Sequence, residues 1–106
     1  MSEITQDRME AALHYLGETD KDYALEKAEL ERSEIARKRA RAKVFLTVDG
    51  TVAERQAKAE IDESVTESDD RYIECVQIFE TLKARRERAE IVIDVWRSIN
   101  AARRKV

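Results

Sequence analysis

The sequence contains no proline and only 2 glycines among its 106 residues. Compact β and α/β folds use these residue types to reverse the chain every few residues, so their scarcity argues against such folds. What the sequence has instead is 41% charged and 42% hydrophobic residues, with the large hydrophobic ones regularly spaced. This composition is typical of long helices and coiled coils rather than of a disordered chain. The predicted fold class is therefore all-α.

Cysteine, histidine and long apolar runs are equally scarce. Cys75 is the only cysteine and His14 the only histidine, which excludes an intrachain disulfide and a cysteine-rich zinc site. The N-terminus lacks the basic and apolar segments of a signal peptide, and the apolar stretch 91–99 is too short to cross a bilayer. We expect a cytoplasmic protein without membrane or small-molecule partners. The net charge of −3 provides no global positive field that attracts nucleic acid.

The strongest interruption of the helical pattern lies near the middle of the chain. Gly50 can adopt the left-handed backbone that ends a helix, and Thr51 with Glu54 forms a capping box that starts a new one. The sequence predicts a single helical unit with a first arm over residues 1–48, a turn at 49–51 and a long, uninterrupted helix over 52–106. Gly17 marks a weaker interruption, and both a break and a continuous helix are compatible with it.

Apolar residues of the second arm recur at alternating steps of three and four, which indicates a helix packed along one face. This stripe contains Tyr72, Cys75, Phe79, Leu82, Ala89, Ile93 and Trp96, with Arg86 at its one charged position. The first arm is less regular and predicts a narrow, partly polar seam. Its apolar positions are Met9, Leu13, Leu16, Tyr23, Ala28, Ile35, Ala42 and Phe45.

Two arms of similar length around a tight turn predict a long antiparallel, coiled-coil-like hairpin. In this register the basic run at 37–43 lies opposite Glu60, Asp62 and Glu63, which supports the register more than the stability. Apolar residues around 72–82 and 91–99 cover more helix surface than one neighbouring helix can bury. We therefore expect a homodimer in which two hairpins form a four-helix bundle. Its assembly core is predicted to contain Tyr72, Cys75, Phe79, Leu82, Ile93 and Trp96.

The residues that could carry chemistry have simpler structural explanations. His14 lies at helical spacing from Glu10 and Glu18, but one histidine with exposed carboxylates is a weak metal site. The acidic residues between 60 and 70 lack the glycine and the spacing of a calcium loop, and a hairpin has no evident pocket for a general acid or base. Cys75 has no basic neighbour to activate it. We predict no enzyme activity and no catalytic, metal-binding or cofactor-binding residues.

Positive charge is concentrated in three clusters, of which the two nearer the C-terminus have few acidic neighbours. These two clusters contain the candidate contacts for nucleic acid or a protein partner: Arg85, Arg86, Arg88, Arg103, Arg104 and Lys105. Such residues can neutralise phosphates, but no known nucleic-acid-binding motif and few aromatic residues accompany them. Nucleic acid is therefore the less favoured partner.

Two stretches of the sequence also resemble a known group of proteins. They are GTVAERQAKAE at residues 50–60, and KARRERAE at 83–90 with its continuation VWRSINAARR at 95–104. Together they resemble small helical proteins encoded by bacteriophages and prophages, whose genes often lie near those for recombination and single-strand-DNA-binding proteins. The resemblance implies a non-enzymatic phage accessory protein in a bacterial cytoplasm and carries over no catalytic residues.

Three hypotheses about function follow. The leading one is an accessory protein that binds a host or phage protein by helix-on-helix contact, in phage DNA metabolism or host takeover. The first alternative is a nucleic-acid-binding factor in recombination or replication that uses the arginine clusters. The second is an inhibitor of a host defence or polymerase system that presents an acidic face as a nucleic-acid mimic, which the small net charge makes less favoured.

Overall fold

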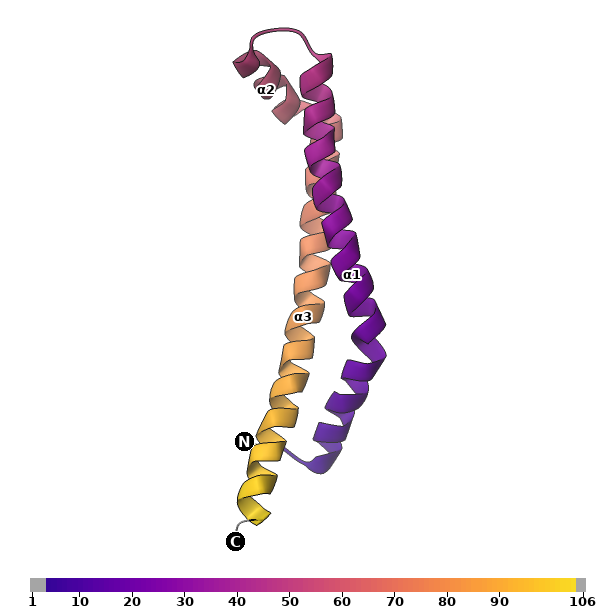
Figure 1. Ribbon diagram of the computed structural model, residues 1–106, viewed down its shortest axis with the longest axis vertical. Coiled ribbons are helices and arrows are strands. Elements are labelled where there is room, and N and C mark those ends of the chain that lie inside the picture. Colours follow the sequence, from indigo (N-terminus) through magenta and orange to yellow (C-terminus); the bar gives the residue numbers. More distant parts are fainter. Residues whose placement is uncertain (1–3, 105–106) are drawn as a thin grey trace. The chain divides into compact units, whose positions relative to one another are not determined.

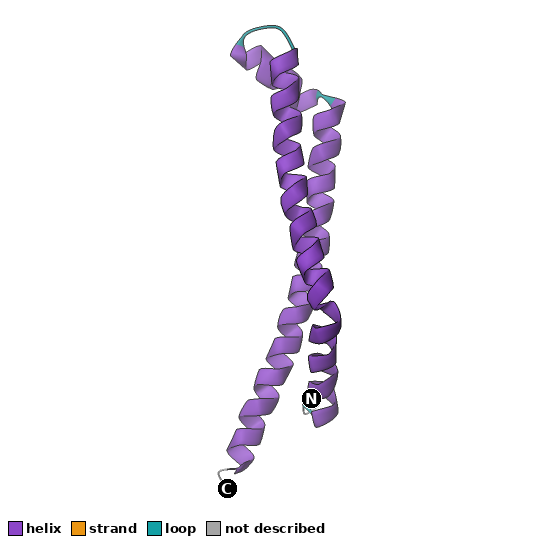
Figure 2. Cartoon of the chain, turned by 45° about the vertical axis from the view of Figure 1, so that its right-hand side comes forward, coloured by secondary structure: helices purple, strands orange, loops and turns teal. Residues whose placement is uncertain are grey.

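A computed structural model of the chain describes residues 4–104, which form helices joined by two short connections (Figure 1; Figure 2). Helix α1 spans Gln6–Thr47, α2 spans Val52–Ile61 and α3 spans Glu63–Arg104. No strand occurs between residues 4 and 104. The predicted all-α, hairpin-like fold is confirmed.

The chain divides into two compact units. The turn unit is Leu25–Phe79 and contains the second half of α1, all of α2 and the start of α3. The terminal unit contains, among the described residues, 4–24 and 80–104. Within each unit, a segment of α1 packs antiparallel to a segment of α3 around a small apolar cluster of its own.

The connection between α1 and α2 contains the predicted capping interaction. Thr51 has extended backbone, and its hydroxyl oxygen accepts a hydrogen bond from the Glu54 N–H at 3.2 Å. Gly50 has a φ of 124°, a conformation that residues with a Cβ rarely adopt. A Cβ at this position would also lie 2.7 Å from Oε2 of Glu54. The chain therefore turns where the glycine and the cap coincide.

The predicted uninterrupted helix over 52–106 is wrong, because Asp62 separates α2 from α3. Asp62 has extended backbone (φ −69°, ψ 136°). Its Oδ1 accepts hydrogen bonds from the backbone N–H of Ser64 at 2.9 Å and from the Ser64 hydroxyl at 2.6 Å. Asp62 therefore caps the N-terminus of α3, and these bonds lower the pKa of its carboxyl. The prediction missed this break because it relied on glycine and proline as markers, and neither occurs here.

Helix α1 continues through Gly17 without a break. The hydroxyl of Thr19 donates to the carbonyl oxygen of Tyr15 at 2.8 Å, one turn back along the same helix. Thr19 therefore does not cap a new helix. A single glycine with helical residues on both sides is not sufficient to end a helix.

The packed face of α3 is the one that its apolar spacing predicts. Cys75, Phe79, Ala89 and Ile93 are buried, while Tyr72, Leu82, Arg86 and Trp96 are half-buried. On this helix, large apolar side chains mark the seam clearly enough to be recognised from the sequence.

The seam of α1 differs from the predicted one. Ala12, Ser33 and Val44 are buried, whereas Leu13 and Ile35 of the predicted seam are about half exposed. One series of buried and half-buried positions repeats at steps of three and four: Met9, Ala12, Leu16, Thr19, Tyr23, Glu26, Leu30, Ser33, Arg37, Ala40 and Val44. Five residues beside this series are also half-buried, namely Tyr15, Ala28, Glu29, Arg41 and Phe45. Small and polar residues alternate with the apolar ones, so the large hydrophobic residues predict only part of this seam: Met9, Leu16 and Tyr23 lie on it, but Leu13 and Ile35 do not.

Candidate interaction surface

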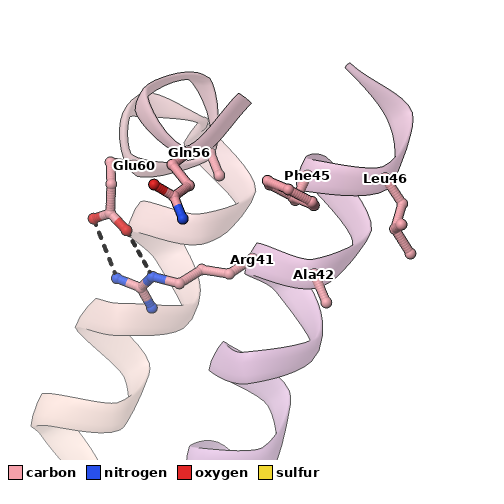
Figure 3. A pocket seen from close by; sticks show the side chains of 7 residues that line it. Arg41, Ala42, Phe45, Leu46, Gln56 and Glu60 are labelled. Carbon is pink, nitrogen blue, oxygen red and sulfur yellow. Dashed lines mark hydrogen bonds and ion pairs between the residues drawn. The ribbon is translucent and has the colours of Figure 1, made fainter. Parts of the chain in front are cut away.

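An ionic cluster around Arg41 joins all three helices of the turn unit. The guanidinium of Arg41 on α1 donates to both carboxylate oxygens of Asp69 on α3, at 2.7 and 2.6 Å. It also donates to Glu60 of α2 at 3.0 Å, as Figure 3 shows. These hydrogen bonds raise the pKa of Arg41, chiefly through Asp69, and the bond from Arg41 is the main reason that the pKa of Asp69 is lowered.

Arg37 completes this cluster. Its Nε donates to Oδ1 of Asp69 at 3.2 Å, and its guanidinium lies 4.5 Å from the ring centre of Tyr72. The sequence predicted acidic partners for this basic run, and Glu60 is one of them. The main partner, Asp69, lies about two turns further along than the predicted Glu63, because α2 is a separate helix and shifts the register of α3.

In the terminal unit, Arg86 of α3 forms hydrogen bonds to α1, as Arg41 of α1 does to α2 and α3 in the turn unit. Its guanidinium donates to the Leu16 carbonyl at 3.0 Å, to the Thr19 hydroxyl at 2.7 Å and to Asp20 at 2.7 Å. It also lies 5.0 Å from the ring centre of Tyr23. Only 15% of the Arg86 side chain is exposed. The Arg86 guanidinium is therefore already hydrogen-bonded within the chain, whereas the predicted binding residues Arg85 and Arg88 beside it are exposed.

The remaining predicted basic contacts lie at the surface or outside the described residues. Arg85, Arg88, Arg103 and Arg104 are exposed, and Arg103 lines a hollow of about 230 Å³ beside Trp96 and Ile99. Lys105 lies outside the described residues. Without Arg86, the cluster at 83–88 has fewer side chains that can reach a phosphate.

The six predicted assembly residues pack within the single chain. Cys75, Phe79 and Ile93 are buried there, and Tyr72, Leu82 and Trp96 are half-buried. The homodimer stays a prediction, and it needs side chains other than these to supply most of its contact surface.

The two residues that could bind a metal or act as a nucleophile, His14 and Cys75, have the following environments. His14 Nε2 lies 3.5 Å from a carboxylate oxygen of Glu18, and both side chains are largely exposed. Cys75 is a buried free thiol. Among residues 4–104, no three His, Cys, Asp or Glu side chains come together in a way that could hold a metal ion. None of the described helices is both long and apolar enough to cross a membrane.

Ten large apolar side chains outside the seams are exposed among the described residues, some in each unit. They are Leu13, Leu25, Ile35, Leu46, Val52, Ile61, Ile73, Ile78, Ile91 and Val95, and their exposed fractions range from 38% to 83%. Such side chains on helices that already have a buried face are typical of surfaces that bind another protein.

In the terminal unit, one exposed apolar residue, Leu13, lines a shallow groove, whereas Ile91 and Val95 lie on α3 outside its lining. Leu13, Leu16 and Ile93 line a hollow of about 350 Å³ together with the charged residues Glu90, Asp94 and Arg97. Ile91 and Val95 follow Glu90 and Asp94 directly in the sequence and are 60% and 38% exposed. The sequence identified the abundance of apolar residues on this part of α3, but assigned Leu13 to the packed seam.

In the turn unit, two open hollows lie on either side of α1. One, of about 680 Å³, lies between α1 and α2 and is lined by Ala42, Phe45, Leu46 and residues of α2 (Figure 3). The other, of about 850 Å³, is lined by α1 residues that include Ile35 and Arg39 and by Ser64 of α3.

Comparison with known proteins gives no relative from which a function can be transferred. No family model, no curated protein and no solved structure matches the chain.

Proposed function

We propose that this chain is a non-enzymatic protein-interaction module that binds an amphipathic helix of a partner protein at the terminal unit. The observation that carries the proposal is the 46% exposure of Leu13 in a groove that Leu16 and Ile93 also line, on helices whose seam is already filled. Burying such side chains against a partner removes apolar surface from water and stabilises the complex.

The groove beside Leu13 indicates what kind of helix would fit. Its apolar lining from Leu16 and Ile93 can accept one or two large hydrophobic side chains spaced one helical turn apart. The carboxylates of Glu90 and Asp94 at the same groove favour a basic residue beside them, and Arg97 favours an acidic one. The surface therefore suits a partner helix with an apolar stripe flanked by both signs of charge.

We further propose that the protein acts in a bacterial cytoplasm as a phage or prophage accessory protein, in phage DNA metabolism or host takeover. This setting is supported by the resemblance of residues 50–60, 83–90 and 95–104 to such proteins. The internal hydrogen bonds of Arg86 favour a protein partner over nucleic acid, because they remove one cation from the basic cluster.

Site-specific photocrosslinking in bacterial cells tests the proposal. A photoreactive benzoylphenylalanine at Asp94, which lines the groove, is expected to give a discrete heteromeric adduct, while the same group at exposed Glu18 gives none. The adduct should disappear when Leu13→Lys introduces a charge into the groove. An adduct of equal yield at both positions, or one insensitive to Leu13→Lys, would contradict binding at this groove.

A second measurement distinguishes the protein-binding proposal from the nucleic-acid-binding alternative. Binding of a single-stranded oligonucleotide that weakens steeply with salt and is lost in the double variant Arg85→Glu, Arg88→Glu would favour that alternative. We expect no such binding at about 150 mM salt, a concentration at which exposed charges are already strongly screened.

A further inference from the structure

The half of α1 in the turn unit has a second regular stripe on the side away from its seam. The stripe alternates steps of three and four and consists of Leu25, Ala28, Arg32, Ile35, Arg39, Ala42 and Leu46. Its three large apolar residues are exposed, Leu25 by 54%, Ile35 by 49% and Leu46 by 74%. Figure 3 shows Leu46 pointing away from Gln56 and Glu60 of α2.

The order of residue types along this stripe is the same in both directions. From either end it reads Leu, Ala, Arg, Ile, Arg, Ala, Leu, with Ile35 at its centre. When two copies of such a helix lie antiparallel about Ile35, each leucine meets a leucine and each alanine an alanine, which suits an apolar contact. Arg32 of one copy then faces Arg39 of the other, so their like-charged ends have to point outward into water. We propose that this outer face of α1 binds a second copy of the chain, antiparallel, with the two-fold axis beside Ile35.

The charges that flank the stripe select the antiparallel orientation. Glu31 and Lys38 lie on one flank, and Glu29 and Lys43 lie on the other. In the antiparallel pair, Glu31 faces Lys38 of the second copy and Lys38 faces its Glu31, so two attractive contacts form at once. In a parallel, in-register pair, Lys38 would instead approach Lys43 of the second copy. Flanking charges of this kind set partner orientation in coiled coils.

The remaining residues of the stripe permit close packing. Ala28 and Ala42 are small enough to let two helix backbones approach each other. Arg32 already has an acidic neighbour, because its Nη1 lies 3.4 Å from Glu29, and the aliphatic parts of Arg32 and Arg39 can cover apolar surface while their charged ends stay in water. The hollow of about 850 Å³ that Ile35 and Arg39 line leaves space for side chains of the second copy.

The stripe from Leu25 to Leu46 is about 33 Å long at the rise of an α-helix. A contact of this length between two helices is at the small end of specific interfaces, so the dimer should be concentration-dependent. The inference rests on the proposed function in one respect, because both treat exposed apolar helix faces as binding surfaces. The two surfaces belong to different units and can be tested separately.

Sedimentation equilibrium of the full chain over a range of concentrations tests the proposal. The mass should rise from 12.3 kDa towards twice that value. Ile35→Glu should weaken dimerisation by about 30-fold or more, the loss expected for a charge placed at the centre of an apolar contact. Ile73→Glu is the matched control, because Ile73 is 54% exposed on α3 and lies outside the stripe. Circular dichroism of both variants establishes that they remain folded.

Cysteine crosslinking tests the orientation. In a Cys75→Ala background, Ala28→Cys and Ala42→Cys should each give little disulfide-linked dimer alone, and a mixture of the two should give it readily. This follows because position 28 faces position 42 of the second copy only in the antiparallel pair, and disulfides form only between closely placed residues.

Three results would overturn the inference. They are a mass of 12.3 kDa at all concentrations, a dimer unaffected by Ile35→Glu, and efficient crosslinking of either single-cysteine variant with itself. None of them affects photocrosslinking at Asp94, so failure of this inference is distinguishable from failure of the proposed function.

Discussion

Two half-buried arginines form hydrogen bonds between helices, each within its own unit. Arg41 joins α1 to Asp69 and Glu60, and Arg86 joins α3 to the backbone and side chains of α1 between Leu16 and Asp20. The sequence revealed Arg86 as the charged position in an apolar stripe. It did not reveal its partners, because a serine, threonine or carbonyl acceptor has no spacing signal of its own.

Arg86→Ala is expected to lower the free energy of unfolding by about 2 kcal/mol. The substitution removes charge-assisted hydrogen bonds from a site that is mostly closed to water and leaves an empty seam position. Urea denaturation followed by circular dichroism measures the change, and exposed Arg85→Ala should alter it by less than about 0.5 kcal/mol. Equal effects of the two substitutions would show that the Arg86 contacts contribute nothing specific.

Asp69→Asn is expected to make stability less dependent on pH. The pKa of Asp69 is lowered in the folded chain, so its ionised form stabilises the fold above the unfolded-state pKa of about 3.9. That contribution is lost as pH falls through the lowered folded-state value. The variant should therefore be less stable than the parent by about 1–2 kcal/mol at neutral pH, and the difference should shrink below about pH 4.

Urea titrations at pH 7 and pH 3 measure this difference, with Asp70→Asn as the control. Asp70 is exposed and lies next to Asp69 in the sequence. A gap between the parent and Asp69→Asn that grows on acidification would contradict the assigned role of the carboxylate.

At the scale of elements, the two glycines have opposite roles. Gly50 stands in a turn with positive φ and has Glu54 close to the place of a Cβ, whereas Gly17 lies inside α1 with no atom within 4 Å of that place. The sequence pointed to both positions as interruptions. It distinguished them only by the Thr51 cap that follows Gly50.

Alanine at the two glycines should therefore change stability in opposite directions. Gly50→Ala should lower the free energy of unfolding by about 1–2 kcal/mol, because the positive φ is strained for a residue with a Cβ. Gly17→Ala should raise it by about 0.5–1 kcal/mol, since alanine loses less conformational entropy in a helix. Thermal and urea denaturation of both variants measure these changes. A destabilising Gly17→Ala would mean that this glycine has a packing role.

The helices themselves were predictable because heptad spacing and the Thr51 cap are local sequence patterns, formed by residues close together in the chain. The break at Asp62 was not, since aspartate also occurs commonly on exposed helix faces and becomes a cap only through the conformation around Ser64. The α1 seam was not predictable for a related reason. Ala12 is buried because it packs against Ala89 and Ile93 of α3, and this information is non-local.

At the scale of the whole molecule, the described core contains two small apolar clusters, with Cys75 and Phe79 buried outside them. Ala12, Ala89 and Ile93 form the buried part of one, and Val44, Ala59 and Val65 form the buried part of the other. Alanine and valine have little surface to bury, so each larger member contributes a disproportionate share. The exposed apolar residues contribute little to the fold of a single chain, which leaves them available for binding.

Ile93→Ala is expected to lower the free energy of unfolding by about 2–4 kcal/mol, because it removes buried methylene groups and leaves a cavity. Ile91→Ala on the exposed face should have an effect of less than about 0.5 kcal/mol. The fluorescence of Trp96, the only tryptophan, reports unfolding of the terminal unit, and circular dichroism reports all helices. Similar losses for the two isoleucines would contradict the assignment of inner and outer faces.

Because Cys75 is buried, the rate at which its thiol reacts reports how often the turn unit opens. Its thiol is 1% exposed, so a water-soluble disulfide reagent can react only when the helices around it separate. When separation is fast and reversible, the observed rate divided by that of an unfolded thiol gives the fraction of time this unit spends open. The native cysteine thus reports local opening of the turn unit without an added label. If a second copy binds along α1, the reaction of Cys75 with the reagent should become slower.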